Sequence, residues 1–368
     1  MHQIERAIFD LRRGLPVIID DHDSDSALVY PLECLTDPGI TRLVKQAGGE
    51  PALTVSRHRM QAMGFPISVA AACLPLANHK ADSAELIQAA ISARSAHSAL
   101  FREPRPAGPS ERAALALMRR ALLIPAALTA RINPNLRPEL DERIRAGELL
   151  AVEAREAEHC FEHASGMLRR VSEAAVPLAE ATKSRFILYR EPDGLREHLA
   201  VMIGQRENWP TAVPVRLHSA CLTGDLFASL RCDCGEQLRT AIETIAGLGG
   251  GVLLYLAQEG RGIGLANKLR AYALQDEGHD TVEADGILGF GEDERRYGVA
   301  VDMLNNLDIR RVHLLTNNPV KIAALANGGI DVARQDRLYG QVTDHNRRYL
   351  NAKASRSGHL LDELLDKS

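Results

Sequence analysis

The chain has 368 residues, of which 45% are hydrophobic and 25% are charged, and it carries a formal net charge of −4. This length predicts two domains, and the composition is that of a soluble globular protein. The charge excludes a global basic field for nucleic acid, and no apolar run is long enough to span a membrane, so we expect neither partner. Six scattered cysteines do not make a disulfide framework, which favours the reducing cytoplasm.

Strands and helices alternate in the first half of the chain. Residues 4–14 have apolar positions at helical spacing, and residues 15–21 follow as a buried strand that runs into an acidic turn. We expect a second helix at 39–49, a second strand at 51–56 and a long helix at 108–128. This alternation predicts an α/β layer.

The second half begins after a charged, helix-prone join at residues 141–172. We therefore expect two domains, 1–169 and 170–368, each of α/β class with a mixed sheet and flanking helices. Short apolar runs predict the strands of the second domain, at 184–191, 198–204, 212–219, 250–257 and 311–316.

Three of the six cysteines lie close together in the sequence, at Cys221, Cys232 and Cys234. A structural zinc site usually closes with four protein ligands, whereas three ligands and one open position are typical of a catalytic zinc that binds water. Such a metal lowers the pKa of its water toward neutrality. The alternatives are that His218 closes the site as a fourth ligand, or that the thiols are buried small side chains.

A strand, a glycine-rich loop and a helix are predicted over residues 252–278. The loop holds Gly260, Gly262 and Gly264, which let the backbone approach an anion, and the following helix offers N–H groups in its first turn. Arg261 lies inside the loop and can grip a phosphate with two donors. A glycine-rich turn without a ligand is the alternative.

The helix after this loop carries Leu265, Leu269 and Tyr272 on one face, and helical spacing alone predicts a core position for Tyr272. Further on, Asp293 and Arg295 lie together in a charged segment. A carboxylate beside an arginine can act as a base, although such a cluster is usually a solvated helix start.

Thr316 ends a strand and Lys321 follows five residues later, so a hydroxyl and an ammonium group are available to hold a nucleotide. A helix cap by Asn317 or Asn318 is the alternative. Together with the cysteines and the loop, these residues predict a zinc hydrolase that acts on a phosphorylated nucleotide.

Seven blocks of sequence resemble GTP cyclohydrolase II, in the order and with the spacing of that family, over roughly residues 170–368. The resemblance implies an enzyme that opens the imidazole ring of GTP, releases formate and pyrophosphate, and leaves a diaminopyrimidine ribosyl phosphate. This is the first committed step of riboflavin biosynthesis. The blocks are RLHSACLTGD, RCDCGEQL, QEGRGIGL, RAYALQD, DTVEA, LGFGEDER and LLTNNPVK.

The resemblance implies roles for individual residues. Asp293 matches the general base and Tyr272 a residue near the reacting ring. Arg295 matches the residue assigned as nucleophile toward the α-phosphate, although a guanidinium that stays protonated is better suited to stabilising charge there. The expected GTP contacts are Arg216, Leu217, His218, Ser219, Ala220, Gln237, Glu259, Gly260, Arg261, Thr281, Thr316 and Lys321.

The resemblance also implies cofactors and a partner. Cys221, Cys232 and Cys234 would bind one zinc ion per subunit, whose water would attack C8 of the guanine. A magnesium ion would bind the triphosphate rather than a protein cage. A second copy of the chain is the expected protein partner, in a homodimer.

Two positions depart from the family pattern. Ala220 stands where a glutamate is usual, which removes one carboxylate near the zinc and is expected to alter its tuning. Gly262 stands where asparagine is common, which is expected to loosen the loop. Neither change removes a zinc ligand or the Asp293–Arg295 pair, so activity is still expected.

The first half more weakly resembles 3,4-dihydroxy-2-butanone 4-phosphate synthase, in AIFDLRRGLPVIIDD. The residues that this family needs for catalysis and metal binding are missing. An Arg-Glu-Asn-Glu segment is replaced by DDHDSDS at 20–26, and a Gly-His-Thr-Glu motif by GPSE at 108–111. We therefore expect a degenerate domain without synthase activity, with an acidic surface turn at 20–26.

Three other interpretations stay open at this point. The first is a paralogue that opens the ring of a different nucleotide, which Ala220 keeps possible. The second is a non-catalytic nucleotide-binding scaffold with a structural zinc. The third is a bifunctional enzyme that also converts ribulose 5-phosphate.

Overall fold

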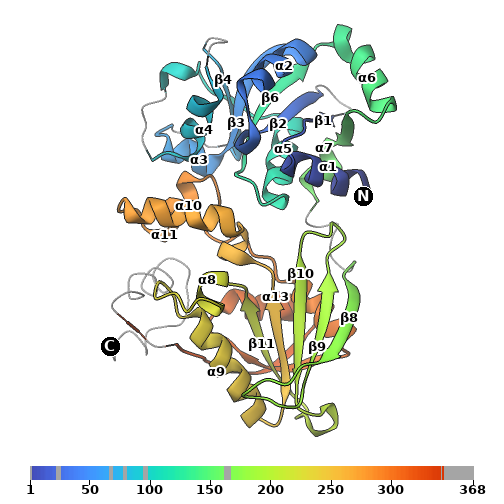
Figure 1. Cartoon of the computed structure of the whole chain (residues 1–368), viewed down its shortest axis with the longest axis vertical. Helices are drawn as coiled ribbons and strands as arrows, with labels where there is room; N and C mark the ends of the chain where they lie inside the picture. Colours follow the sequence, from blue (N-terminus) through green and yellow to red (C-terminus); the bar gives the residue numbers. More distant parts are fainter. Residues whose placement is uncertain are drawn as a thin grey trace. The chain divides into compact units, whose positions relative to one another are not determined.

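The computed structural model describes residues 2–21, 26–65, 69–77, 81–93, 98–160, 167–340 and 342–343. The chain forms two compact units, Met1–His163 with Ala266–Asp293, and Ala164–Leu265 with Glu294–Ser368. Each unit contains a mixed seven-stranded sheet with flanking helices, which confirms the predicted fold class (Figure 1).

The first unit contains these strands and helices. The strands are β1 (Val17–Asp20), β2 (Ala27–Pro31), β3 (Gly48–Ser56), β4 (Ala71–Pro75), β5 (Arg105–Pro106), β6 (Ala126–Ile132) and β7 (Leu150–Glu153). The helices are α1 (His2–Arg12), α2 (Asp37–Ala47), α3 (Arg57–Ala62), α4 (Ser83–Ile91), α5 (Pro109–Arg120), α6 (Arg137–Arg145), α7 (Ala154–Glu158), α10 (Leu265–Asp276) and α11 (Thr281–Ile287).

Helices cover both faces of the first sheet, whose strand order is β5-β4-β3-β6-β2-β1-β7. Side chains alternate between the faces along each strand. Leu53 and Val55 of β3 therefore join a buried cluster that includes residues of α2 and α4, whereas Ala52 packs in a separate cluster with Leu115 of α5. β1 pairs in parallel with β7 and antiparallel with β2.

The second unit has its own set of elements. The strands are β8 (Arg169–Ala175), β9 (Ser184–Arg190), β10 (Glu197–Ile203), β11 (Val213–Ser219), β12 (Gly251–Leu256), β13 (Arg311–Leu315) and β14 (Asp331–Asp336). The helices are α8 (Leu222–Asp225), α9 (Cys234–Gly247), α12 (Gly298–Asn306) and α13 (Pro319–Asn327), and a 3-10 turn, η6, spans Glu259–Gly262.

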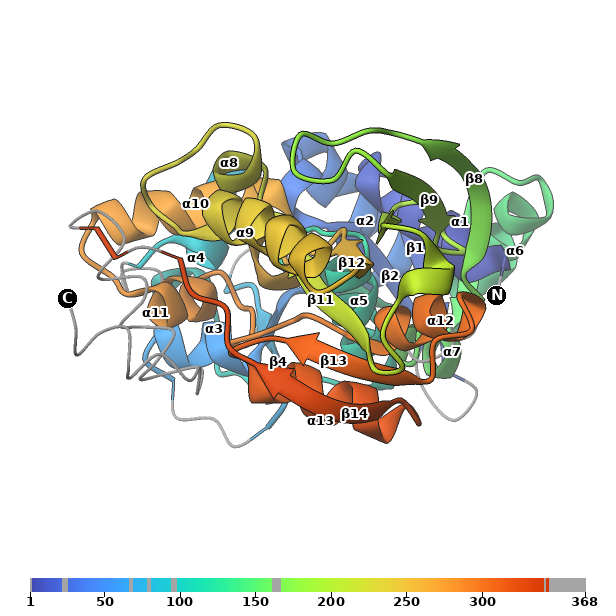
Figure 2. The same cartoon turned by 90° about the horizontal axis from the view of Figure 1, so that it is seen from below.

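The second sheet has the order β14-β13-β11-β12-β10-β9-β8, and its edge strands β14 and β8 are labelled in Figure 2. Its parallel part runs from β14 to β12, and the pairings from β12 to β8 are antiparallel. Ala241 and Ile245 of α9 pack with Leu253 in one cluster, and Ala300 of α12 packs with Leu254 in the other. Neighbouring residues of β12 thus face opposite layers.

The units differ from the predicted domains in one respect. The division near the middle of the chain falls at 163/164, close to the predicted boundary, but residues 266–293 pack with the first unit although their sequence lies in the predicted second domain. The role assigned to each half stays a prediction.

Several local predictions were wrong. The helix expected at 108–128 ends at Arg120, because Leu122 adopts a left-handed conformation, φ 60°, and β6 begins at Ala126. The charged join at 141–172 was predicted to be helix-prone, but it contains the strand β7, which pairs in parallel with β1. The predicted strands at 184–191, 198–204, 212–219, 250–257 and 311–316 are all confirmed as β9 to β13.

Among the described residues, no helix has the length and apolar character needed to cross a membrane. Asp20 ends β1, and its carboxylate accepts hydrogen bonds from Ser26 at 2.6 Å and from Arg137. The rest of the predicted acidic turn, at 22–25, lies outside the described residues.

Candidate active site

The predicted site residues of the second unit gather at the carboxyl ends of three parallel strands. Residues 216–221 span the end of β11 and the turn after it, residues 258–262 follow β12, and Thr316 follows β13. β11 lies between β13 and β12, and the chain leaves β11 toward β12 but leaves β13 toward β14. This reversal is a topological switch point, where open α/β sheets bind ligands.

Cys221, Cys232 and Cys234 come together in a thiol cluster. Their Sγ atoms all lie within 4.8 Å of one another, and the Sγ atoms of Cys221 and Cys232 are 3.6 Å apart. Tetrahedral ligands at a Zn–S distance of about 2.3 Å lie roughly 3.8 Å apart, so this spacing suits a thiolate-bound zinc. A hydrogen bond with Cys221, together with burial, raises the pKa of Cys232 to about 11.

Two glycines make room for the thiol cluster. A Cβ atom at Gly224 would lie 2.7 Å from Cys232 Sγ and 3.2 Å from Cys221 Sγ. A Cβ atom at Gly235 would lie 2.2 Å from the carbonyl oxygen of Gly224, so α8 and the first turn of α9 meet without a side chain between them. The donor set and this close packing therefore fit a metal ion held by three thiolates.

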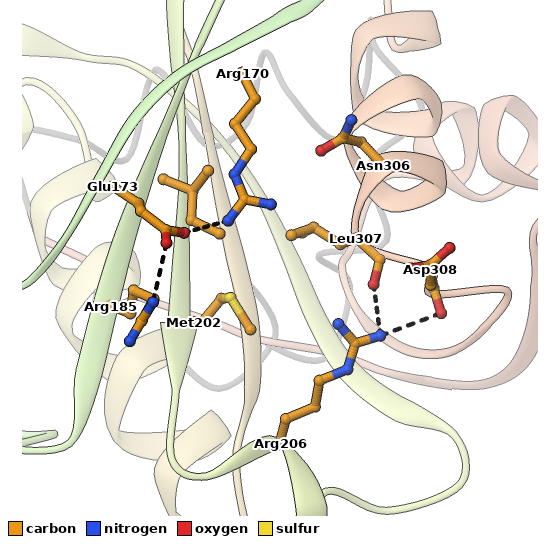
Figure 3. A pocket seen from close by; sticks show the side chains of 9 residues that line it. Arg170, Glu173, Arg185, Met202, Arg206, Asn306, Leu307 and Asp308 are labelled. Carbon is orange, nitrogen blue, oxygen red and sulfur yellow. Dashed lines mark hydrogen bonds and ion pairs between the residues drawn. The ribbon is translucent and has the colours of Figure 1, made fainter.

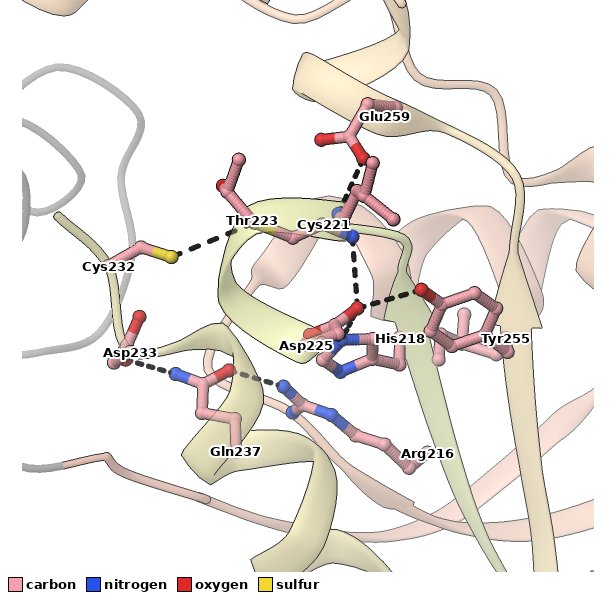
Figure 4. A network of polar contacts seen from close by, with 12 residues as sticks. Arg216, His218, Cys221, Thr223, Asp225, Cys232, Asp233, Gln237, Tyr255 and Glu259 are labelled. Atoms are coloured by element: carbon pink, nitrogen blue, oxygen red, sulfur yellow. Dashed lines mark hydrogen bonds and ion pairs between the residues drawn. The ribbon is translucent and has the colours of Figure 1, made fainter. Parts of the chain in front are cut away.

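Asp225, at the end of α8, connects the thiol cluster to the sheet (Figure 4). Its carboxylate accepts hydrogen bonds from the Cys221 backbone N–H at 3.0 Å and from the Tyr255 hydroxyl at 2.8 Å. It also accepts a hydrogen bond from His218 Nε2 at 3.1 Å, so the imidazole proton is on Nε2. One carboxylate thus orients the backbone of a predicted ligand and two side chains of neighbouring strands.

His218 is buried against this carboxylate. Its ring stacks on Tyr255, with centroids 5.6 Å apart and planes at 12°. Burial lowers the pKa of His218, which keeps the ring neutral near pH 7. The arrangement does not favour His218 as a fourth ligand, because its Nε2 faces Asp225. Among the described residues, the candidate metal-binding group consists of the three cysteines.

Arg216 lies buried beneath the site. Its guanidinium donates to the Leu315 carbonyl oxygen at 2.9 Å and to Gln237 Oε1 at 2.6 Å, and Gln237 donates in turn to Asp233. Burial lowers the pKa of Arg216 to about 10. Its Nε has no hydrogen-bond partner within the described part of the chain. A buried cation with an unused donor is suited to an acceptor group of a bound ligand.

Lys321 and Arg295 both lie beside the ring of Tyr297. The ammonium nitrogen of Lys321 is 5.6 Å from the ring centroid, and the guanidinium carbon of Arg295 is 5.8 Å from it. Lys321 also donates to the Leu217 carbonyl oxygen at 2.6 Å. Asn318 caps α13 by accepting a hydrogen bond from Val320 N at 2.9 Å, which confirms the predicted cap.

The glycine-rich loop does not offer the predicted backbone cradle at two of its N–H groups. Gly260 and Arg261 adopt left-handed conformations, with φ 62° and 59°, and turn the loop back on itself. Gly262 N then donates to Gln258 O at 3.1 Å, and Gly264 N donates to Glu259 O at 2.9 Å. These two groups are used inside the loop.

Two further contacts define the surroundings of the loop. Glu259 Oε2 accepts a hydrogen bond from Leu222 N at 2.6 Å and so caps α8. Glu294 N donates to Arg261 O at 3.1 Å, and a Cβ atom at Gly262 would lie 2.9 Å from Glu294 O. Gly262 therefore permits a close backbone approach, and the expected loosening of the loop stays a prediction.

The other three predicted site residues, Tyr272, Thr281 and Asp293, belong to the first unit. Thr281 is the first residue of α11, and Tyr272 is half-buried in α10, where the ammonium nitrogen of Lys268 lies 5.7 Å from its ring centroid. The predicted apolar face of α10 is wrong, because Leu269 is 52% exposed. The helix buries Asn267, Lys268, Ala271 and Leu274 instead.

A surface pocket of about 280 Å³ lies elsewhere in the second unit (Figure 3). Glu173 accepts hydrogen bonds there from Arg170 and from Arg185, the latter at 3.1 Å. Arg206 donates to the Leu307 carbonyl oxygen at 2.6 Å. None of the predicted site residues lines this pocket.

Sequence reasoning missed Asp225, Tyr255 and Tyr297. Asp225 stands inside the block RLHSACLTGD, four residues after Cys221, and this spacing on a short helical turn was an available signal. Tyr255 is adjacent to His218 only through the parallel register of β11 and β12. Tyr297 lies two residues after Arg295, but its burial depends on the packing of α12.

Comparisons with known proteins agree with these observations. The profile of the GTP cyclohydrolase II family matches residues 169–337. The chain is 42% identical to GTP cyclohydrolase-2 of Azospirillum brasilense, over 98% of this chain and 94% of that one. It is 39% identical to GTP cyclohydrolase-2 of Xylella fastidiosa, over 97% of this chain and 87% of that protein.

The riboflavin biosynthesis protein RibBA of Bacillus subtilis is 43% identical to the chain, over 61% of this chain and 56% of that protein. A solved two-domain 3,4-dihydroxy-2-butanone 4-phosphate synthase from A. baumannii aligns with 92% of the chain, at a TM-score of 0.35 and 19% identity. The likeness of the first half to that synthase family stays a prediction.

Proposed function

Because the chain belongs to the GTP cyclohydrolase II family, we propose that it opens the guanine imidazole ring of GTP and releases formate and pyrophosphate, as the first committed step of riboflavin biosynthesis. The observation that carries this proposal is the thiol cluster that begins just after β11, together with two buried cations of the same unit, Arg216 in β11 and Lys321, which donates to the β11 carbonyl oxygen of Leu217. A ring to be hydrolysed and a triphosphate to be neutralised need these two kinds of group together.

Cys221, Cys232 and Cys234 would hold a zinc ion as thiolates. When bound, zinc supplies Lewis acidity and a water of lowered pKa at the guanine ring. Asp225 fixes the orientation of the Cys221 backbone, and its hydrogen bonds to His218 and Tyr255 hold the carboxylate in place. A magnesium ion would accompany the triphosphate of GTP.

The residues of the chain divide between the ends of the nucleotide. Arg295, Arg261 and Lys321 would neutralise the triphosphate, and Arg295 would stabilise charge at the α-phosphate rather than act as a nucleophile. Arg216 and Gln237 would contact the nucleotide on the thiol side, together with residues 217–220, Glu259, Gly260 and Thr316. Tyr272 would lie near the reacting ring, Thr281 would contact GTP, and Asp293 would act as the general base.

We expect the enzyme to act in the cytoplasm as a homodimer, without nucleic acid. The first unit is expected to lack synthase activity. Support comes from Glu111, at the position of the missing Gly-His-Thr-Glu motif. It accepts hydrogen bonds from Gly108 N at 2.7 Å and from Arg105 Nη1 at 2.9 Å, and so closes the start of α5.

The proposal is tested by measuring formate and pyrophosphate together from GTP and magnesium, with zinc-loaded protein. Equal amounts of both are expected, and Cys232→Ser should release no formate. Pyrophosphate without formate would show that the ring is not opened, and Ala220 would be the first position to examine as the cause. Neither product from GTP, with turnover of another nucleotide, would replace the proposal by the paralogue interpretation.

A further inference from the structure

The segment 266–293 lies inside the stretch that matches the family profile, yet it packs with the N-terminal unit. α11 contacts α3, which is about two hundred residues earlier in the chain (Figure 1). The segment carries Tyr272, Thr281 and Asp293. Their position is therefore determined by contacts with the first 163 residues as well as by the chain connections to the second unit.

One attachment is at the carboxyl end of α11. Arg59 is 1% exposed, and its guanidinium donates to the carbonyl oxygen of Ile287 at 2.8 Å. It also donates to the carbonyl oxygens of Ala89 and Ser92, each at 2.8 Å, at the end of α4. Ser56 Oγ donates to the Gly289 carbonyl oxygen at 2.6 Å.

This attachment has a clear physical basis. The last carbonyl groups of a helix lack partners within the helix and carry the negative end of its dipole. One buried guanidinium satisfies such carbonyls of α4 and of α11 at once. The charge of Arg59 thus joins the ends of two helices, and neither helix end can move without leaving a buried polar group unpaired.

A second attachment is in the first two turns of α10. Asn267 is fully buried and donates to the Leu122 carbonyl oxygen at 3.2 Å. Arg270 donates to both carboxylate oxygens of Glu33, at 3.1 Å and 3.0 Å, and to Asn267 Oδ1 at 2.6 Å. Glu33 also accepts a hydrogen bond from Ile124 N at 2.6 Å, so its carboxylate joins α10 to the residues just before β6.

We infer that the first unit fixes the segment that carries Tyr272, Thr281 and Asp293, with Arg59, Ser56 and Glu33 as positioning residues that hold α10 and α11. In the sequence, Tyr272 and Thr281 lie between the two attachments, and Asp293 follows Gly289 by four residues. This inference rests on the proposed function. It gives the domain that lacks the synthase motifs a role in the cyclohydrolase reaction.

The test compares Glu33→Gln with Glu111→Gln in the full-length protein. Each carboxylate lies in the first unit, pairs with an arginine and accepts a backbone N–H. Glu111 makes these contacts with Arg105 and Gly108, outside the segment 266–293. Both changes therefore replace a paired carboxylate by a neutral amide. Only Glu33→Gln weakens an attachment of α10.

Small displacements of catalytic groups cost about 100-fold per ångström, so Glu33→Gln is expected to lower kcat for formate release by about tenfold or more. Its metal content should match that of wild type. Hydrogen exchange should rise in peptides from 266–293 but not in those from 218–238. Glu111→Gln should keep wild-type kcat and exchange in 266–293, even where its unfolding midpoint falls.

Arg59→Lys and Arg59→Gln supply a second pair. The lysine keeps a cation at the two helix ends and should retain more kcat than the glutamine, at equal metal content. Wild-type kcat and exchange in Glu33→Gln would overturn the inference, as would equal losses of kcat in Glu33→Gln and Glu111→Gln. A wild-type protein that releases neither formate nor pyrophosphate would reject the proposed function, and the exchange data would still decide whether the first unit holds 266–293.

Discussion

Asp225 shows how much of the site depends on one carboxylate outside the predicted ligand set. It accepts hydrogen bonds from the backbone of Cys221 and from the side chains of Tyr255 and His218. Groups that orient metal ligands in this way matter nearly as much as the ligands themselves.

Asp225→Asn replaces a carboxylate that accepts three hydrogen bonds by an amide that can accept through one oxygen only. We expect the affinity for zinc to fall by about 10-fold to 100-fold, because the Cys221 backbone loses its fixed orientation. Competition with a chelator measures this affinity. Asp308→Asn, a change of the same kind outside this network, is the control and should not alter it.

Gly224→Ala tests the room left for the thiol cluster. The added Cβ would lie 2.7 Å from Cys232 Sγ, so the cluster must open or the helix must shift. Such overpacking costs about 1–3 kcal/mol, which lowers the zinc bound per chain. Gly247→Ala, at the end of α9 and with no atom of the described residues within 4 Å of the new Cβ, should keep full zinc content. Equal metal content in both variants would contradict the geometry.

At this scale, residue type and spacing in the sequence were enough to bring the three cysteines into one predicted cluster, and their Sγ atoms do lie together. The partner of His218 was not predictable in the same way. It depends on which side chains the register of β11 with β12 places next to each other, and Tyr255 stands opposite His218 in that register. Local sequence contains no record of such a pairing.

The loop between β12 and α10 is the element whose behaviour differs most from expectation. Its glycines adopt positive φ, but the N–H groups of Gly262 and Gly264 donate to carbonyl oxygens of the loop itself and not to a cradle for an anion. Arg261 thus offers a side chain where a backbone cradle was expected. The reason is that glycine content predicts conformational freedom and not the partner of each N–H group.

Gly262→Asn restores the residue that is common in the family and should nevertheless be harmful in this chain. The position has φ 97° and its Cβ would lie 2.9 Å from the backbone of Glu294. We expect the free energy of unfolding to fall by about 1–3 kcal/mol, which lowers the unfolding midpoint. Pyrophosphate release should also become slower. The matched control is Gly278→Asn, at φ 109° with no atom of the described residues within 4 Å of its Cβ. Equal effects would attribute the loss to backbone strain alone.

At the scale of the whole molecule, the sequence predicts two mixed sheets correctly, because the short apolar runs between helical patterns are strong signals. It does not predict that residues 266–293 pack with the first unit. That association rests on buried polar contacts such as those of Arg59 and Asn267, which join segments far apart in the sequence. Hydrophobic periodicity contains no information about them.

Removal of the metal should destabilise the second unit. Its single tryptophan, Trp209, donates to Ile203 O at 2.8 Å and packs beside the core of that unit, so its fluorescence reports on unfolding there. A metal that binds the folded state at 100 times its Kd stabilises it by about 2.7 kcal/mol. Chelation should therefore lower the midpoint of the Trp209 transition, and in Cys232→Ser it should not. An unchanged wild-type midpoint would contradict metal binding by the thiol cluster.

The most direct test of the central claim follows the ring carbon itself. Wild-type protein, loaded with zinc, would be given magnesium and GTP that carries a heavy-carbon label at C8, and the products would be followed by carbon NMR. Ring opening predicts that the label leaves as formate, in step with pyrophosphate. Label that remains in the nucleotide while pyrophosphate is released would contradict the assignment as a GTP cyclohydrolase II.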